Sequence, residues 1–144
     1  MSVDRISLRS LKDVRWIEFS SSARADGELY VMQAGAEVPF ELVRVFVVRA
    51  AVGATRGRHA HRRCSQLLVC VGGAVDVTCD DGAGTASFVL DSPRRGLLVP
   101  PTIWAEQKYS QPHSTLMVLC DRPYEAEDYI HGMDAFVKYR REKA

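Results

Sequence analysis

Residues 66–90 read QLLVCVGGAVDVTCDDGAGTASFVL, and this stretch indicates the fold class. It contains three short apolar runs, which cover residues 66–71, 74–79 and 86–90. In the middle run, valine and cysteine alternate with aspartate and threonine, as in a strand with one buried face. The Asp81-Gly82 pair that follows this run is a typical hairpin signal. The stretch therefore predicts consecutive antiparallel strands.

The rest of the chain continues this pattern. Further β-rich runs cover residues 43–52, 96–99 and 115–120. Short strands with turn residues about every ten positions are typical of an all-β sandwich or barrel. The C-terminal segment differs, because apolar residues at helical spacing lie between the acidic Glu125 and the basic Lys143. We expect a short helix there, and one domain over residues 1–144.

The composition excludes several classes of protein. Lys and Arg total 19 and Asp and Glu total 18, so the formal net charge is +1. This balance, without a basic tail, argues against nucleic-acid binding. The sequence has no apolar run of about 18 residues and no export signal, so we expect no membrane role. The four cysteines lack CxxC spacing, and we expect free thiols in a cytoplasmic protein.

The segment RGRHAHRRCSQ at residues 56–66 carries the candidate catalytic groups. His59 and His61 are two residues apart, and side chains at i and i+2 of a strand point to the same face. We therefore expect both imidazoles to point into the mouth of the barrel. An imidazole titrates near neutrality, which suits general acid–base catalysis.

Four arginines share this segment, at positions 56, 58, 62 and 63. The planar guanidinium group suits phosphate or carboxylate recognition. Strand alternation predicts Arg63 on the face of the histidines, with Arg58 and Arg62 on the opposite face. A basic cluster is also typical of a solvated surface, so we expect only one or two of the four to contact a ligand.

The HxH pattern is also that of the first metal-binding motif of cupins, which a carboxylate and a later histidine complete. Here Gln66 stands at the carboxylate position and Ala105 at the later histidine position. A neutral amide is a poor metal ligand, and alanine is none. We therefore expect no catalytic metal and no other cofactor, which leaves His59 and His61 free for acid–base work.

Six stretches of the chain together resemble the dTDP-sugar 3,4-ketoisomerases. These are metal-independent, WxcM-like cupins that act on dTDP-4-keto-6-deoxyglucose. The stretches are VPFELVRVFVV (38–48), RGRHAH (56–61), QLLVCVGG (66–73), DDG (80–82), LDSPRRGLLVPPTIWAE (90–106) and YEAEDYIHGMDAF (124–136). Their spacing is similar to that of the family from about residue 26 to residue 139.

This resemblance implies a cupin, or jelly-roll, β-barrel, and a homodimer with exchanged N-terminal strands. It implies a dTDP-4-keto-6-deoxyhexose as the substrate. By position, His59 matches the family's proposed base and His61 its partner. Arg44 and Arg56 match arginines that contact the ligand, and Arg63 is a further candidate from the basic cluster.

The chain also departs from the family pattern. Phe46 and Val47 stand where tyrosines are common, and Ala105 stands where some members have a histidine. A role for a tyrosine hydroxyl or a third histidine is therefore lost or supplied elsewhere. Tyr30 and Tyr109 are candidate replacements for the tyrosine.

The expected reaction moves a ketone from C4 to C3 of the sugar through an enediolate, with His59 removing the C3 proton and His61 relaying or returning a proton. A sugar 3,5-epimerase remains an alternative, because it also removes a proton next to the C4 ketone. A non-catalytic nucleotide-sugar-binding cupin is a second alternative. The incomplete ligand set argues against a metal-dependent dioxygenase.

Overall fold

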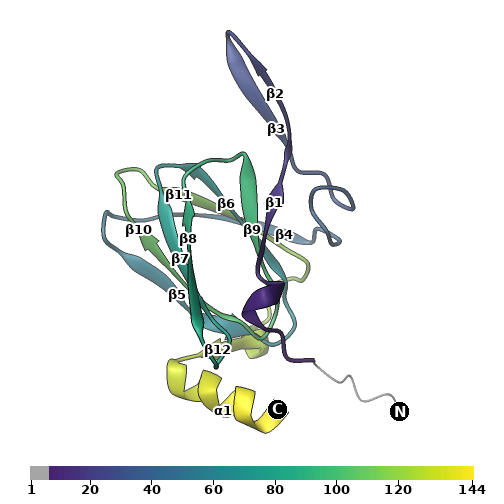
Figure 1. Cartoon of the computed structure of the whole chain (residues 1–144), viewed down its shortest axis with the longest axis vertical. Helices are drawn as coiled ribbons and strands as arrows, with labels where there is room; N and C mark the ends of the chain where they lie inside the picture. The colour runs from purple at the N-terminus through teal and green to yellow at the C-terminus, as the bar shows by residue number, and fades with distance from the viewer. Residues whose placement is uncertain (1–6) are drawn as a thin grey trace.

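The computed structural model describes residues 7–144, which form two five-stranded sheets and a projecting hairpin (Figure 1). The first sheet contains, in spatial order, β1 (Arg15–Glu18), β9 (Arg95–Val99), β6 (Gln66–Gly72), β11 (Thr115–Cys120) and β4 (Arg44–Arg49). The second contains β12 (Tyr129–His131), β5 (Thr55–His61), β10 (Trp104–Tyr109), β7 (Val75–Asp80) and β8 (Thr85–Leu90). All neighbouring strands are antiparallel. The predicted all-β class is confirmed.

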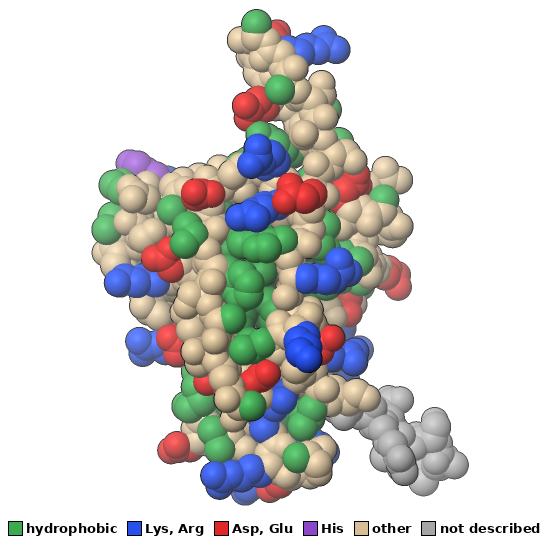
Figure 2. Space-filling model, in the orientation of Figure 1, with side chains coloured by type: hydrophobic (Ala, Val, Ile, Leu, Met, Phe, Trp, Pro, Cys, Tyr) green, Lys and Arg blue, Asp and Glu red, His purple; other side chains and the backbone are tan. Residues whose placement is uncertain are grey.

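The main hydrophobic core draws residues from both sheets. In β7 the burial alternates as predicted, with Val75, Val77 and Cys79 fully buried. All four cysteines are free and buried, as the sequence predicted. On the side of the sandwich between β1 and β8, Trp16 and Phe88 pack edge to face with ring centroids 5.8 Å apart. Figure 2 shows hydrophobic side chains along this side. Since β1 and β8 belong to different sheets and do not pair, packing of these side chains closes this side of the sandwich.

The hairpin consists of β2 (Ser20–Arg24) and β3 (Gly27–Val31), which pair with no other strand of residues 7–144. It extends away from the sandwich (Figure 1). Every residue of β2 is exposed, and Leu29 on β3 is 62% exposed. The hairpin therefore buries little apolar surface within one chain.

The predicted C-terminal helix is present, but it begins later than the sequence pattern suggested. Helix α1 spans Met133–Lys143, while Tyr129–His131 forms the edge strand β12. Between them, Gly132 has a φ of 86°, a left-handed conformation that ends the strand and allows the change in direction. Phe136 on α1 packs against Ala60 and Ile130, so the helix covers the outer face of β5 and β12.

Across residues 7–144, no helix has both the length and the apolar character needed to cross a bilayer.

Candidate functional site

The two histidines of β5 follow a β-bulge. Gly57 and Arg58 have positive φ values of 84° and 57°, and the pairing of β5 with β10 shifts register between Ala105 and Glu106. A Cβ at position 57 would overlap the Gln107 side chain and lie 3.0 Å from the Ala105 carbonyl oxygen, so glycine is required there. Beyond the bulge, His59 and His61 share one face, with ring centroids 5.1 Å apart. The prediction that the two imidazoles point together is confirmed.

His61 is bound to a buried carboxylate that the sequence analysis did not identify. Its Nδ1 lies 2.8 Å from Oδ2 of Asp128, and both side chains are 7% exposed. The backbone N–H groups of Arg63 and Cys64 also donate to Asp128, at 2.7 and 3.3 Å. Burial alone raises the pKa of the Asp128 carboxyl, but these hydrogen bonds outweigh burial, and the pKa lies below its ordinary value. The carboxylate therefore fixes the proton of His61 on Nδ1 and leaves Nε2 pointing away from Asp128.

The free nitrogen of His61 is buried. Its Nε2 has no hydrogen-bond partner among residues 7–144. A buried polar atom without a partner costs free energy, which a ligand that hydrogen-bonds to Nε2 would recover.

His59 lies in a different environment. Its Nδ1 lies 3.0 Å from the carbonyl oxygen of Gly57. A carbonyl can only accept, so Nδ1 carries the proton and Nε2 holds a lone pair. Burial, together with the neighbouring imidazoles of His61 and His131, lowers the pKa of His59 to about 4. His59 is therefore a neutral base at physiological pH.

Strand β12 adds two more rings to this face of β5. Tyr129 pairs with His61 and His131 pairs with His59 in the strand register. The ring of Tyr129 lies 4.5 Å from that of His61 and 5.0 Å from that of His59, centroid to centroid. Tyr124, which is 66% exposed, lies 5.6 Å from Tyr129. We call these five rings, of residues 59, 61, 124, 129 and 131, the ring cluster.

Arg44 reaches the ring cluster from the opposite sheet. Its Nη2 donates to the Tyr129 hydroxyl at 3.3 Å and to Cys120 Sγ at 3.8 Å. The Gln66 amide donates to the same sulfur, at 3.6 Å. The Cys64 thiol and Arg44 lower the pKa of Cys120 by donating to its sulfur. These contacts fix a permanent positive charge beside the histidines.

The other predicted arginines, Arg56 and Arg63, lie near the two ends of β5. Arg63 lies after the end of β5, where the chain bends, so the alternation that was expected to place its side chain with the histidines does not extend to it. Arg56 is on β5 but lies before the bulge. Both side chains are exposed, and neither forms an ion pair within residues 7–144.

The candidate replacement tyrosines lie outside the cluster. Tyr109 belongs to the main core, where burial raises its pKa to about 12. The Tyr30 hydroxyl donates to Glu28 on the projecting hairpin. Tyr129 is instead the tyrosine in contact with both histidines.

The donor set does not fit the metal of a typical cupin. Gln66 uses its amide as a donor to Cys120, and Ala105 offers no ligand atom. A second combination, His61, Cys64 and Asp128, has ligand atoms within 4.8 Å of one another. In that combination, however, Asp128 already accepts hydrogen bonds from His61 Nδ1 and from the backbone N–H of Cys64.

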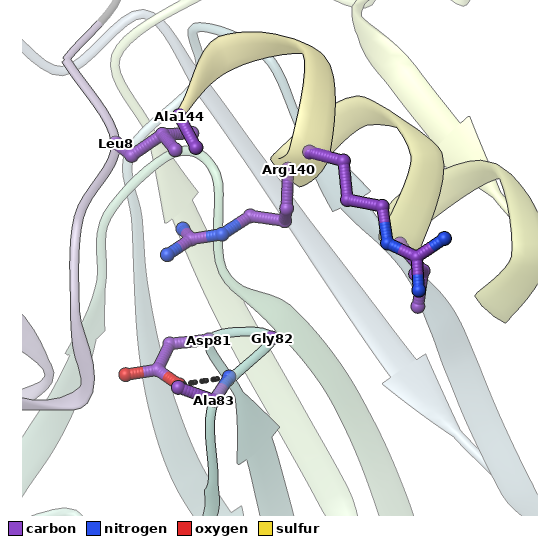
Figure 3. A pocket seen from close by; sticks show the side chains of 8 residues that line it. Leu8, Asp81, Gly82, Ala83, Arg140 and Ala144 are labelled. Carbon is purple, nitrogen blue, oxygen red and sulfur yellow. Dashed lines mark hydrogen bonds between the residues drawn. The ribbon is translucent and has the colours of Figure 1, made fainter.

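A separate cavity of about 310 Å³ lies on the outer side of the second sheet, between α1 and the β7–β8 loop (Figure 3). Arg140 lines it, but its guanidinium already donates to the carbonyl oxygens of Arg9 and Thr102, at 2.8 and 3.0 Å. Asp81 accepts from the backbone N–H groups of Leu11 and Ala83, at 3.0 and 2.9 Å. These contacts hold the N-terminal segment, the helix and the loop together, which explains the polar groups there without a ligand.

Comparison with known proteins places this geometry in a family. The family model described as FdtA: WxcM-like, C-terminal matches residues 12–141. The chain belongs to this family. The resemblance predicted from the sequence is therefore confirmed.

Individual proteins of known activity are also similar to this chain. The TDP-4-oxo-6-deoxy-alpha-D-glucose-3,4-oxoisomerase of Aneurinibacillus thermoaerophilus is 36% identical over 124 residues, covering 85% of this chain and 89% of the relative. The crystal structure of QdtA, a sugar 3,4-ketoisomerase from Thermoanaerobacterium thermosaccharolyticum in complex with TDP, is 27% identical, with a TM-score of 0.88. The alignment with QdtA covers 93% of this chain and 98% of the QdtA chain. A mutant of QdtA in complex with TDP-4-keto-6-deoxyglucose is 26% identical, with a TM-score of 0.88, covering 92% and 97% of the two chains.

The similarity to QdtA also confirms the cupin-like, jelly-roll class predicted from the sequence. Sequence reasoning missed Asp128, Tyr129 and His131 as site residues. Their stretch is part of the family pattern, but its apolar spacing predicts the start of a helix. The three-residue strand β12 brings it beside β5 instead.

Proposed function

We propose that this protein is a sugar-nucleotide 3,4-ketoisomerase that converts dTDP-4-keto-6-deoxyglucose to a dTDP-3-keto-6-deoxyhexose. One observation carries the proposal: two imidazoles 5.1 Å apart have different partners, a carbonyl for His59 and a buried carboxylate for His61. A reaction that moves hydrogen between adjacent carbons and between their oxygens needs two such groups. Two relatives of this chain, one of them QdtA, are named as a 3,4-oxoisomerase and a 3,4-ketoisomerase.

The first half of the reaction forms an enediol. The C3 hydrogen is acidic because it neighbours the C4 carbonyl. Neutral His59 takes this proton through Nε2, while His61 donates a proton from its Nε2 to O4. The step requires His61 to enter with both ring nitrogens protonated, a form whose positive charge the Asp128 carboxylate stabilises. The C3–H electron pair becomes the C3–C4 double bond, and the carbonyl pair becomes the O4–H bond.

The second half reverses these roles. His59 returns its proton to C4 while His61 accepts the proton of the C3 hydroxyl, and the C3 carbonyl forms. Carbon 3 is oxidised as carbon 4 is reduced, so electrons balance without a redox cofactor. Both histidines end in their starting protonation states, which makes the cycle catalytic.

The arginines have separate proposed roles. Arg44 is held by Tyr129 and Cys120 beside the rings, so it stabilises the negative charge that develops on the sugar oxygens. Arg56 and Arg63 are exposed and form no ion pair with any of residues 7–144, so we assign them contacts with the diphosphate.

The active form is proposed to be a homodimer. The projecting hairpin leaves Leu29 62% exposed, and the outer face of β4 exposes Val45 and Val47 at 48% and 57%. Among the described strands, β4 has a neighbour on one side alone. Packing of the hairpin onto a second copy would bury apolar surface that one chain leaves in water.

The proposed cellular setting is the cytoplasm. Four free, buried cysteines suit a reducing compartment, which supports a cytoplasmic enzyme.

The test is incubation with dTDP-4-keto-6-deoxyglucose in deuterium oxide, followed by NMR of the sugar. The expected product is a dTDP-3-keto-6-deoxyhexose, with the ketone at C3. A retained C4 ketone with inverted C3 and C5 would identify an epimerase, and unchanged substrate at high protein concentration would indicate a binding module. A chelator in a parallel reaction is expected to leave the rate unchanged.

A further inference from the structure

His131 has no role in the reaction described above, although its ring lies within the ring cluster. It stands on β12, the edge strand, and its side chain is exposed. Its ring stacks on Tyr129 with centroids 5.4 Å apart and planes 8° apart. Its centroid is 5.8 Å from that of His59, the residue opposite it in the strand register.

The surroundings of His59 restrict how a proton can leave it. Its Nδ1 is bound to the Gly57 carbonyl, and three rings surround it, those of His61, Tyr129 and His131. The side chain of His61 is 7% exposed, and the Tyr129 ring has no nitrogen lone pair that could accept a proton from His59. Of the three, His131 alone combines an exposed side chain with ring nitrogens that can both accept and donate a proton.

We propose that His131 carries protons between His59 and bulk water, and so sets how much substrate hydrogen exchanges with solvent during turnover. This inference rests on the proposed function. While the enediol exists, His59 holds the proton taken from C3. That proton moves to neutral His131, directly or through one water, and His131 releases it to solvent. A solvent proton returns by the same route, and no electron transfer is involved.

The charges around His59 give the proposal a second consequence. The groups facing it are imidazoles from β5 and β12, the Tyr129 ring, and, through Tyr129, the guanidinium of Arg44. Asp128 is turned toward His61. A protonated His131 therefore adds positive charge beside His59 and disfavours its protonation.

The experiment compares His131→Asn with His113→Asn, a matched control. His113 is another exposed histidine, in the connection between β10 and β11, where it lies beside Arg49 and Val52 rather than in the ring cluster. Reactions run in deuterium oxide at low conversion, and NMR measures deuterium at C4 of the product per turnover. We expect this ratio to fall roughly tenfold or more in His131→Asn and to stay at the wild-type value in the control.

Two further readouts distinguish relay from a structural effect. Added imidazole should restore exchange in His131→Asn, because the small base can occupy the vacated position. The pH below which kcat/KM falls should be higher in this variant, because His59 no longer has the positive charge of a protonated His131 beside it. An unchanged exchange ratio would overturn the inference, as would a lower ratio that imidazole does not restore. Absence of any C3 ketone with the wild-type protein would instead overturn the proposed function.

Discussion

Replacing Asp128 with asparagine tests the pairing on which the proposed chemistry depends. The carboxylate accepts from His61 Nδ1 at 2.8 Å, from Arg63 N at 2.7 Å and from Cys64 N at 3.3 Å. Asparagine keeps one oxygen but turns an NH₂ group toward an N–H donor, so at least one of these hydrogen bonds is lost in a buried site. Hydrogen bonds to charged groups contribute roughly 1.5–3 kcal/mol each. We expect the free energy of unfolding to fall by about 2–4 kcal/mol.

The effect of Asp128→Asn on turnover should be larger than its effect on substrate binding. Without the carboxylate, the imidazolium form of His61 loses its stabilising charge, and the amide no longer fixes the proton on Nδ1. A positioned acid–base group contributes roughly 10²–10⁴-fold to a rate, so kcat should fall within that range. Initial rates by product NMR and urea denaturation measure the two quantities. Asp134→Asn, which removes an exposed carboxylate from the first turn of α1, is the control.

The pH dependence of unfolding gives an independent check. The pKa of Asp128 is lowered in the fold, so its stabilisation is fully present above the ordinary carboxyl pKa. It is lost as pH falls through the folded pKa, where the wild type and Asp128→Asn should converge in stability. A kcat of Asp128→Asn within threefold of the wild-type value would refute the role of the carboxylate in proton transfer.

Four more predictions concern the neighbouring residues. His59→Asn should abolish exchange of the C3 hydrogen with solvent while nucleotide-sugar binding remains measurable by calorimetry; persistent exchange would exclude His59 as the base. Because burial lowers the pKa of His59 to about 4, kcat/KM should stay constant as the pH falls well below 6.5. The contribution of His59 to the free energy of unfolding should decline between about pH 6.5 and pH 4, because the unfolded chain binds the proton first. Gly57→Ala should reduce both turnover and the free energy of unfolding, the latter by about 1–3 kcal/mol, because its Cβ meets the Gln107 side chain. Gly35→Ala is its control, since Gly35 has a similar φ of 81° and open space around it; equal losses in both variants would show that backbone strain alone matters. Arg44→Lys should raise KM or lower kcat roughly tenfold, because an ammonium cannot reproduce the planar contacts, and wild-type kinetics would remove Arg44 from the site.

The features that the sequence predicted correctly are local in the chain. Alternation within β7 and the i, i+2 spacing of His59 and His61 depend only on strand geometry, and both are present in the structure. Strand β2, with the sequence SSSAR, was missed because it has no apolar face to give a period. Local alternation also failed at Arg63, because β5 ends at His61 and the chain then bends.

The rest of the site depends on contacts across the chain. Asp128 is 67 residues from His61, and no local pattern identifies that partner. The three-residue strand β12 is too short to show a period, and Ile130 fits a helical pattern as well as a strand. The signal that was available is that Asp128, Tyr129 and His131 all lie in the stretch YEAEDYIHGMDAF (124–136), which resembles the family. Only the pairing of β12 with β5 shows that they lie beside His59 and His61.

The two positions at which this chain departs from a metal-binding cupin are both explained by the surrounding contacts. At position 66, a carboxylate would repel Cys120, whose pKa is lowered, whereas the Gln66 amide donates to the sulfur that also accepts from Arg44. At position 105, a histidine would lie beside His59 on β10, since Ala105 is the partner of His59 in the register. The third imidazole instead comes from the other neighbouring strand, at His131, which pairs with the same residue. Position 105 is buried and position 131 is exposed, so the change moves the third imidazole from the interior to the solvent side of His59. An imidazole at the solvent side is poorly placed to share a buried ion, but it is well placed to exchange a proton with water.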